Sequence, residues 1–285
     1  MDGNGRKRRW SKWRTAALVV LALGILVAAK AWHDTMADPV VRRTAVALPG
    51  IPAGSSPLTI ALLSDIHVAG PDMPPERLAR IVAQVNVLKP DIVLIAGDLV
   101  SEKRTATHIY TPQEVVAPLA DLHAPLGVFA VPGNHDHWFD LPALSRELRA
   151  HGIGLLANDA VQAGPLAIGG LDDAYTGRAD VPRTIAAMDR LAGGRVIFGH
   201  SPDSFPQVPR SVSLMLAGHT HCGQLRLPVI GAPATMSRYG DRYACGLKRQ
   251  NGNVLVTTAG LGTSVLPFRF GTRPEIWLIE LRARD

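Results

Sequence analysis

The sequence predicts an α/β domain built on a mixed β-sheet and preceded by one apolar N-terminal helix. Two observations predict the domain: short apolar, β-branched runs end abruptly in polar residues, and stretches with helical spacing separate several of these runs. Runs this short, without clean alternation, are typical of strands buried on both faces. A third observation predicts the helix, because an unbroken apolar run follows a cluster of basic residues near the N-terminus.

Almost all of the positive charge lies in the N-terminal tail. Residues 1–14 hold six basic residues and one acidic residue, a net charge of +5, which leaves +1 of the total +6 for the other 271 residues. Nucleic-acid binding requires a basic face on the folded domain, and the near-neutral remainder does not supply one. We therefore expect no nucleic-acid partner.

Residues 15–32 predict a single transmembrane anchor. The run Ala16–Ala29 is apolar throughout, and counted to Trp32 it approaches the ~20 residues that cross a bilayer. Tryptophans flank the run on both sides, as interfacial tryptophans often do. A cleavable signal peptide is the alternative, because Ala29-Lys30-Ala31 loosely fits a small-residue cleavage site. Under either reading the basic tail stays in the cytoplasm and the rest is exported.

Residues 33–57 are rich in Pro, Ala and polar residues, and they predict a tether between the anchor and a domain over residues 58–285. Two cysteines, Cys222 and Cys245, lie in that domain. Two cysteines do not make a disulfide scaffold, but an exported domain allows them to pair. The sequence leaves open whether they form a disulfide or two free thiols.

Five predicted strands each lead into residues that can bind a metal. In chain order they are Leu58–Ser64 before Asp65-Ile66-His67, Asp91–Ala96 before Gly97-Asp98, Gly127–Val131 before Pro132-Gly133-Asn134-His135-Asp136, Arg195–Phe198 before Gly199-His200, and Ser213–Ala217 before Gly218-His219-Thr220-His221. Because ligands collect at the carboxyl ends of strands in open α/β sheets, we expect these side chains to meet. Carboxylate, imidazole and amide-oxygen donors together suit divalent Mn, Fe or Zn.

Helical spacing separates several of these strands. It covers Pro75–Leu88, which Lys89-Pro90 ends, and then Leu141–His151 and Val181–Leu191. The later strands Asn253–Thr258 and Glu275–Leu281 have no long helix between them, so part of the sheet is predicted to be antiparallel or mixed.

The ordered motifs from Asp65 to His221 resemble those of the calcineurin-like metallophosphoesterase superfamily. The resemblance implies a four-layer α/β sandwich with two central mixed β-sheets and a centre of two divalent metal ions. It implies that Asp65, His67 and His221 bind one ion, that Asn134, His200 and His219 bind the second, and that Asp98 bridges both.

The same resemblance implies hydrolysis of a phosphodiester, phosphomonoester or pyrophosphate bond by in-line attack of a hydroxide that bridges the two ions. His135 matches the family's histidine that helps the leaving oxygen depart. Asp136 is predicted to orient His135, with a simple turn role as the alternative. A serine nucleophile is not expected, because no Gly-x-Ser-x-Gly elbow occurs in the chain.

The second motif distinguishes the chain from protein Ser/Thr phosphatases. Those enzymes usually carry Gly-Asp-x-x-Asp-Arg-Gly, whereas this chain has Gly-Asp-Leu-Val-Ser-Glu-Lys and lacks the arginine that grips phosphate. Closer similarity is to bacterial membrane-associated phosphoesterases of the YkuE/YaeI type, over Gly218–Gln224, Gly260–Ser264 and Leu266–Ile276. In those proteins glycine usually stands where this chain has Cys222. With the charge pattern, the resemblance implies a single-pass protein of the bacterial inner membrane with its metallophosphoesterase domain on the periplasmic side.

Arg269 and Arg273 are the predicted substrate-binding residues, with ordinary surface arginines as the alternative. A membrane anchor raises the effective concentration at the bilayer, which suggests a phosphorylated small molecule or a lipid-linked or envelope substrate. One alternative function is UDP-2,3-diacylglucosamine pyrophosphatase of lipid A synthesis, although that reaction occurs on the cytoplasmic side. Others are a non-catalytic phosphoesterase-fold scaffold and a metal sensor or carrier. The sequence predicts no oligomeric state.

Overall fold

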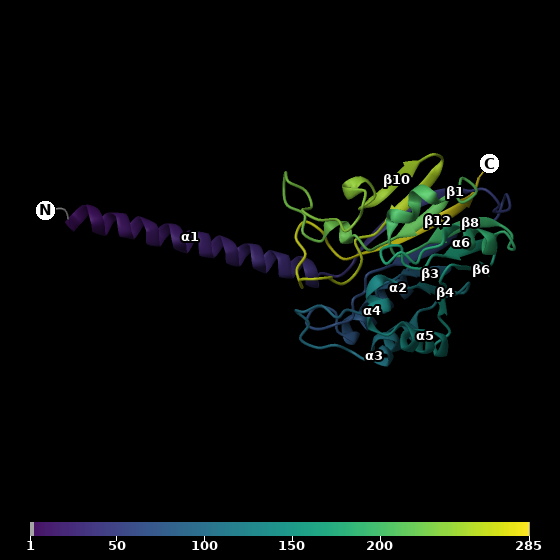
Figure 1. Ribbon diagram of the computed structural model, residues 1–285, viewed down its shortest axis with the longest axis horizontal. Coiled ribbons are helices and arrows are strands. Elements are labelled where there is room, and N and C mark those ends of the chain that lie inside the picture. Colours follow the sequence, from purple (N-terminus) through teal and green to yellow (C-terminus); the bar gives the residue numbers. More distant parts are fainter. Residues whose placement is uncertain (1–2, 285) are drawn as a thin grey trace.

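The structure, a computed structural model, describes residues 3–284 and the side chains of residues 12–284. Helix α1 (Gly3–Met36) projects from one side of the domain (Figure 1). Its segment Lys12–Met36 has a mean hydropathy of 2.1 and is only 6% buried, so by length and composition it is able to cross a membrane. Most basic side chains of the predicted tail, residues 1–14, lie outside the described residues.

The first sheet has six strands in the order β1-β12-β2-β3-β4-β5. Their bounds are β1 (Val40–Leu48), β2 (Leu58–Leu63), β3 (Ile92–Ala96), β4 (Val128–Val131), β5 (Gly154–Leu155) and β12 (Glu275–Ala283). Only the pair β12 and β2 is antiparallel, and the other neighbours are parallel. The sheet is therefore mixed, as predicted.

The second sheet also has six strands, in the order β10-β11-β9-β8-β7-β6. Their bounds are β6 (Asp159–Ala163), β7 (Leu166–Gly170), β8 (Gly194–Phe198), β9 (Leu214–Ala217), β10 (Gly246–Gln250) and β11 (Asn253–Thr257). Its outer pairs are antiparallel and its central pairs parallel.

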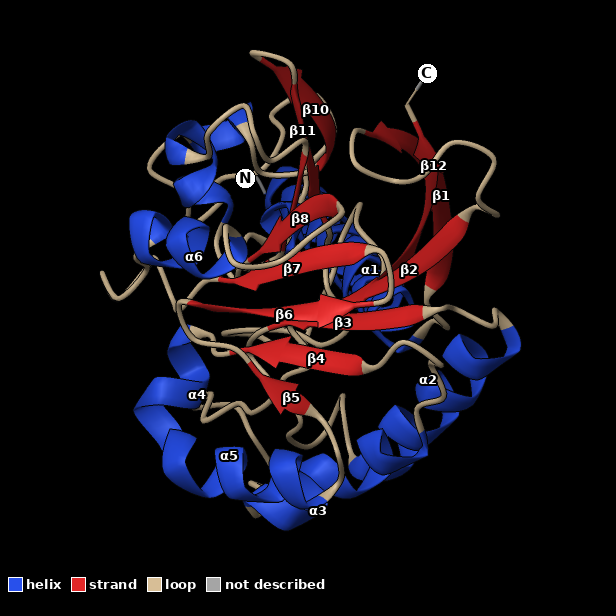
Figure 2. Ribbon diagram, turned by 90° about the vertical axis from the view of Figure 1, so that its right-hand side faces the viewer, coloured by secondary structure: helices blue, strands red, loops and turns tan. Residues whose placement is uncertain are grey.

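Helices cover the outer face of each sheet, which gives the four layers that the family resemblance implies (Figure 2). Helices α2 (Pro75–Val87), α3 (Pro112–Val116), α4 (Asn134–Phe139) and α5 (Leu141–Ala150) lie on the first sheet's side, and α6 (Val181–Met188) lies on the second sheet. The alternate residues of β2 show why the sequences of the strands are continuous apolar runs. Ile60 and Leu62 pack between the sheets, while Ala61 and Leu63 pack under the helices. Both faces are buried, so no polar alternation remains.

The predicted tether over residues 33–57 is wrong for its first half. Residues up to Met36 continue α1, and Val40–Leu48 form β1, which pairs in parallel with β12 from Val40 opposite Glu275 to Leu48 opposite Ala283. β1 is an edge strand whose exposed side chains are Arg42, Arg43, Ala45 and Ala47, so its sequence lacks the continuous apolar run of the buried strands. The folded domain therefore begins before residue 58. Strands β5, β6, β7 and β10 were also not predicted.

Candidate metal centre

The carboxyl ends of five strands, three from the first sheet and two from the second, meet at one edge of the molecule. They bring together the seven predicted metal ligands, which we call the ligand cluster: Asp65, His67, Asp98, Asn134, His200, His219 and His221. Each of these side chains is at most 6% exposed. Burial of so many polar groups is unfavourable unless they are hydrogen-bonded, paired or bound to a metal.

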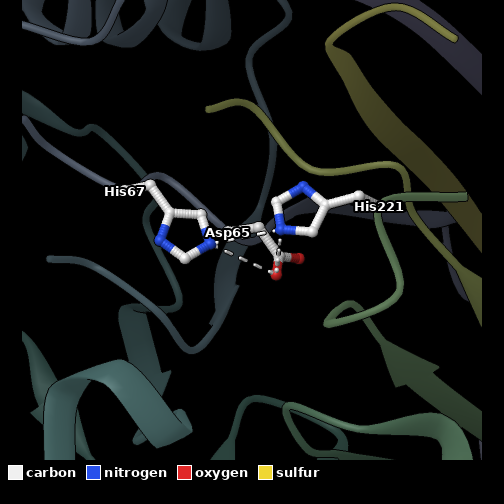
Figure 3. A group of neighbouring side chains, drawn as sticks. All are labelled: Asp65, His67 and His221. Atoms are coloured by element: carbon white, nitrogen blue, oxygen red, sulfur yellow. Dashed lines mark hydrogen bonds and ion pairs between the residues drawn. The ribbon is translucent and has the colours of Figure 1, made fainter. Parts of the chain in front are cut away.

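The first predicted ligand trio, Asp65, His67 and His221, is assembled as expected (Figure 3). Nε2 of His221 lies 3.4 Å from Oδ1 of Asp65, and Nε2 of His67 lies 4.0 Å from the same oxygen. The two Nε2 atoms are 3.2 Å apart. Residues that follow β2 and β9, one strand of each sheet, therefore form one group.

The second group contains Asp98, His200 and His219. Oδ2 of Asp98 lies 3.1 Å from Nε2 of His200 and 3.5 Å from Nε2 of His67, so this carboxylate stands between the two groups. Asn134 begins α4, and its buried Oδ1 accepts no hydrogen bond. A buried amide oxygen that accepts no hydrogen bond from the protein is expected where that oxygen binds a metal ion.

Backbone carbonyls fix which imidazole nitrogens face the cluster. A carbonyl only accepts, so Nδ1 of His67 donates to Val100 O (3.2 Å), Nδ1 of His200 donates to Ala96 O (2.8 Å), and Nε2 of His219 donates to Met236 O (3.1 Å). The other ring nitrogen of each histidine faces the cluster, and Nδ1 of His219 lies 3.1 Å from Nε2 of His200. Converging acceptors repel one another unless a positive charge lies between them. The donor set and its orientation fit divalent metal ions.

Burial and the Asp98 carboxylate decide the protonation of the cluster. Burial lowers the pKa of His67 and of His221 well below the ordinary histidine value, which leaves both neutral, as ligands must be. Burial also lowers the pKa of His219. For His200 burial is outweighed by the contact with Asp98, which raises the pKa well above its ordinary value. Burial alone would raise the pKa of Asp98, but His200 and His67 lower it, so the carboxylate is ionised.

The backbone of the cluster is held in an uncommon conformation. Five of the seven residues have a positive φ, between 49° and 67°: Asp65, His67, Asp98, His219 and His221. Non-glycine residues rarely adopt this region, and it persists where surrounding contacts enforce it. Gly133 and Gly218 allow the close approach, because a Cβ on Gly133 would overlap Oδ1 of Asp98 and a Cβ on Gly218 would overlap Ser64.

His135 lies beside the cluster, and its partner is Glu102, which the sequence did not single out. Nδ1 of His135 lies 2.9 Å from Oε2 of Glu102, while Nε2 is the nitrogen left to face a substrate. Burial lowers the pKa of His135, but the hydrogen bond to Glu102 and the charge of Asp98 raise it above the ordinary value overall. The only hint in the sequence is an acidic residue four positions after Asp98.

The role predicted for Asp136 as the residue that orients His135 is wrong. Its carboxylate is fully buried and accepts four backbone N–H bonds: from Asp98 (2.9 Å), Leu99 (2.8 Å), Val100 (3.3 Å) and Gly133 (2.9 Å). Burial and the charge of Asp98 raise its pKa. Asp136 thus ties the loop after β3 to the loop after β4, which is closer to the turn alternative.

The two predicted substrate-binding arginines differ in their surroundings. Arg269 is fully buried, so it is neither a surface arginine nor open to a substrate. Its Nη2 donates to the carbonyls of Ala259 (2.7 Å) and Gly262 (2.6 Å) and lies 3.4 Å from Nδ1 of His221. Burial lowers its pKa to about 10, so it stays charged at neutral pH. Arg273 is exposed and does not line the pocket described next.

A pocket of about 450 Å³ opens directly onto the ligand cluster. Asp98, Asn134, His135, His219 and His221 form its polar floor. Its walls are mostly apolar or aromatic: Trp138, Tyr175, Leu225, Pro233, Ala234, Met236, Val265 and Leu266. The volume is that of a small-molecule site, with a few polar groups converging on one end. The sequence did not predict these walls.

A disulfide joins Cys222 to Cys245, which answers the question that the sequence left open. Cys222 directly follows His221 and has a φ of 53°, the left-handed region that glycine adopts without strain. This explains why glycine suits the position in the resembling proteins, and the disulfide holds the cysteine there.

Comparisons with known proteins agree with the site. A family model described as calcineurin-like phosphoesterase matches residues 58–223. The metallophosphoesterase YkuE of Bacillus subtilis (strain 168) is 32% identical over 243 residues, which cover 82% of either chain. The phosphodiesterase YaeI of Escherichia coli (strain K12) is 33% identical over 236 residues, 80% of this chain and 83% of its own. A transmembrane protein with a metallophosphoesterase domain from Danio rerio is 31% identical over 258 residues, 81% of this chain and 55% of its own, so this chain spans about half of that relative.

Proposed function

The chain belongs to the calcineurin-like phosphoesterase family, and from its site we propose that it hydrolyses phosphate esters of lipid-linked or envelope-associated substrates at a dinuclear metal centre. One observation carries the proposal: four residues of the ligand cluster and His135 form the floor of a pocket whose walls are largely apolar. A phosphate group reaches the polar floor while an apolar substituent contacts the walls.

The ligand cluster would hold the metal ions in two groups. Asp65, His67 and His221 form one, Asn134, His200 and His219 form the other, and Asp98 stands between them. Two divalent ions, of Mn, Fe or Zn, supply Lewis-acid charge that makes water nucleophilic at neutral pH and neutralises phosphoryl oxygens.

His135 would supply the proton for the leaving group. Because Nδ1 is bonded to Glu102, Nε2 is the atom that donates a proton to the oxygen of the departing alcohol. The Glu102 carboxylate fixes the ring orientation and stabilises the protonated imidazole. Trp138 packs edge-on against the His135 ring, with centroids 5.0 Å apart, and restricts its movement.

The disulfide supports the proposed location on the outer side of the membrane. Disulfides persist in oxidising compartments such as the bacterial periplasm and are rare in the cytosol. The Cys222–Cys245 bond therefore favours an extracytoplasmic domain held by α1, in agreement with the positive-inside pattern. It counts against the UDP-2,3-diacylglucosamine pyrophosphatase alternative, since that reaction is cytoplasmic.

The test compares p-nitrophenyl ethyl phosphate with p-nitrophenyl dodecyl phosphate, which share a leaving group and differ in chain length. Each buried CH₂ contributes about 0.8 kcal/mol, so three to four methylenes in the pocket raise kcat/KM about 100-fold. We expect this preference from the purified full chain in detergent micelles with Mn. Equal kcat/KM for both esters would exclude the apolar substrate class and leave the phosphoesterase intact.

A second arm tests catalysis itself. Turnover of bis-p-nitrophenyl phosphate is measured with Mn, Fe and Zn in the wild type and in His135→Ala. Turnover in the wild type, with retained metal and lost turnover in the variant, is expected of an enzyme. No turnover with any of the three metals would favour the non-catalytic scaffold or the metal carrier instead.

A further inference from the structure

Two loops beside the pocket expose apolar side chains and carry no acidic residue. We call residues 223–240 and 261–274 the rim loops. Both lack Asp and Glu, while they contain Arg226, Arg238, Arg269 and Arg273. Their exposed apolar residues are Leu227, Val229, Ile230, Met236, Val265 and Leu266, with Ile230 75% and Val265 71% exposed. Such a group of exposed apolar side chains marks an interaction surface.

Gln224 joins the two rim loops into one surface. Its Nε2 donates to Leu266 O (2.9 Å) and Phe268 O (3.0 Å), and its Oε1 accepts from Ser264 N–H (2.9 Å). Its backbone carbonyl accepts from Phe270 N–H at 3.1 Å. The exposed apolar residues therefore have a shared and fixed support.

The second rim loop rests on the end of α1. The Trp32 and Phe268 rings pack edge to face with centroids 6.2 Å apart, and Nζ of Lys30 lies 5.4 Å from the centre of the Phe270 ring. The backbone N–H of Arg269 donates to Oγ1 of Thr35 at 2.7 Å. The membrane helix and the rim loops are thus in direct contact, on the side of the domain from which α1 extends (Figure 1).

Buried charges fix the end of α1 to the domain. Nη2 of Arg77 donates to the carbonyls of Thr35 (2.7 Å), in the last turn of the helix, and Ala37 (3.1 Å), just after its end. Nη1 of Arg77 donates to Asp72 O (2.6 Å), and the Asp72 carboxylate pairs with Lys103 and accepts from Thr263 of the second rim loop. Breaking such a buried network is costly, so α1 meets the domain at a set angle rather than through a loose tether.

The helix geometry places the rim at the membrane surface. A helix rises 1.5 Å per residue, so Ala31 and Thr35 lie roughly 3 and 9 Å beyond Ala29, where the apolar run ends. The headgroup layer on each side of a bilayer is roughly 5–8 Å thick. Rim residues that contact the chain between Ala31 and Thr35 therefore lie within this layer or at its outer edge when α1 spans the bilayer.

We propose that the rim loops are a membrane-docking surface, in which Val229, Ile230 and Val265 enter the same bilayer leaflet that α1 crosses. The surface recognises lipid: its apolar residues enter the acyl boundary, and its exposed Arg226 and Arg273 meet anionic headgroups, whereas Arg238 pairs with Asp203. The mouth of the pocket then opens within the headgroup layer. The inference rests on the proposed membrane insertion of α1 and goes beyond it.

Nitroxide accessibility tests the docking directly. The full chain is labelled at Val229→Cys or Val265→Cys, with its own two cysteines in their disulfide, and is reconstituted in phosphatidylglycerol–phosphatidylcholine nanodiscs. Leu21→Cys in α1 reports insertion of the anchor. Val87→Cys is the matched control, because Val87 is an exposed valine (78%) at the other end of the strands, far from the cluster.

Labels at positions 21, 229 and 265 are expected to be more accessible to oxygen than to a nickel chelate. The control label at position 87 is expected to be more accessible to the nickel chelate than to oxygen. An inserted label at 21 with aqueous labels at 229 and 265 would overturn the docking surface and leave the anchor standing. An aqueous label at 21 would overturn both. Activity on bis-p-nitrophenyl phosphate, measured on the samples labelled at positions 21, 87 and 229, none of which lines the pocket, reports the phosphoesterase separately.

A charge variant provides an independent measurement. Val229→Asp with Ile230→Asp is expected to lower turnover of p-nitrophenyl dodecyl phosphate dispersed in vesicles about tenfold, which corresponds to about 1.4 kcal/mol. Neither residue lines the pocket, so turnover of the soluble ethyl ester stays the same. Val87→Asp is the control. An equal loss on both esters, or no loss on either, would contradict the docking surface.

Discussion

The ligand cluster and the rim loops border the same pocket, yet they are built in opposite ways. The cluster consists of buried polar side chains that follow strands, and three of its four imidazoles are oriented by backbone carbonyls. The rim loops have little regular structure and present exposed apolar groups. The difference teaches that the two regions have separate structural origins. Strand ends hold the ligand cluster in place, and under the proposed function the loops would select the substrates that reach it.

Two contacts join the two regions directly: Met236 of the first rim loop accepts the Nε2–H of His219, and Arg269 of the second rim loop lies against His221. The disulfide between Cys222, which follows His221, and Cys245 closes the segment that contains the first rim loop. Mutations that affect the cluster, the joints and the rim are therefore expected to have effects of decreasing size.

The largest effect is expected from Asp98→Asn, which removes the carboxylate between the two ligand groups. The charge that holds both ions is worth several kcal/mol, so kcat/KM on bis-p-nitrophenyl phosphate falls ~1,000-fold or more. Metal content is measured by mass spectrometry on the same samples. Asp121→Asn, at an exposed aspartate, is the control. Activity within about tenfold of the wild type would show that Asp98 is not the bridge.

His135→Ala is expected to lower kcat by ~100- to 10,000-fold while metal content stays the same, because a general acid is lost and no ligand is removed. Glu102→Gln, which keeps the hydrogen bond but removes the charge, is expected to have a smaller effect. Loss of metal in His135→Ala would instead assign His135 to the ligand cluster.

Loss of the disulfide is expected to weaken the joint between the regions. The Cys222→Ala/Cys245→Ala variant opens a loop with a sequence separation of 23. A loop of this length predicts a loss of about 3 kcal/mol in the free energy of unfolding. Thermal unfolding with and without a reductant measures it. A wild-type melting temperature that a reductant does not change would contradict the prediction.

The variant Asp136→Asn tests whether Asp136 stabilises the fold or takes part in the reaction. Its amide nitrogen cannot accept the N–H groups that the carboxylate accepts, so the stability falls by about 2 kcal/mol. The melting temperature drops even in chelator-treated protein, whereas His135→Ala leaves it nearly unchanged. An unchanged melting temperature together with lost turnover in Asp136→Asn would instead support the predicted role of Asp136 in orienting His135.

The smallest effect is expected from Gln224→Ala, which removes the hydrogen bonds between the two rim loops. Without these bonds the pocket wall is less rigid, and the free energy of substrate binding becomes less favourable by about 1 kcal/mol. We therefore expect kcat/KM for p-nitrophenyl dodecyl phosphate to fall roughly fivefold, with a smaller loss for the ethyl ester. A larger loss on the ethyl ester would mean that Gln224 supports the cluster instead of the rim.

The sequence by itself determined the ligand cluster and the strands that carry it. Each motif immediately follows a short apolar run, and the carboxyl ends of such strands meet at one edge in this fold class. The helices at 75–87, 141–150 and 181–188 lie within the predicted ranges 75–88, 141–151 and 181–191, because local periodicity and proline mark such segments. The four layers came from the family resemblance.

Only the tertiary structure decided what supports the cluster. Glu102 meets His135 across 33 residues, and Arg269 reaches Thr35 across 234. Asp136 bonds to a neighbouring loop rather than to His135, the strand Val40–Leu48 pairs with the last strand of the chain, and Cys222 meets Cys245. Local propensity and spacing carry no information on such pairs, because closing the chain around a common core is what brings them together.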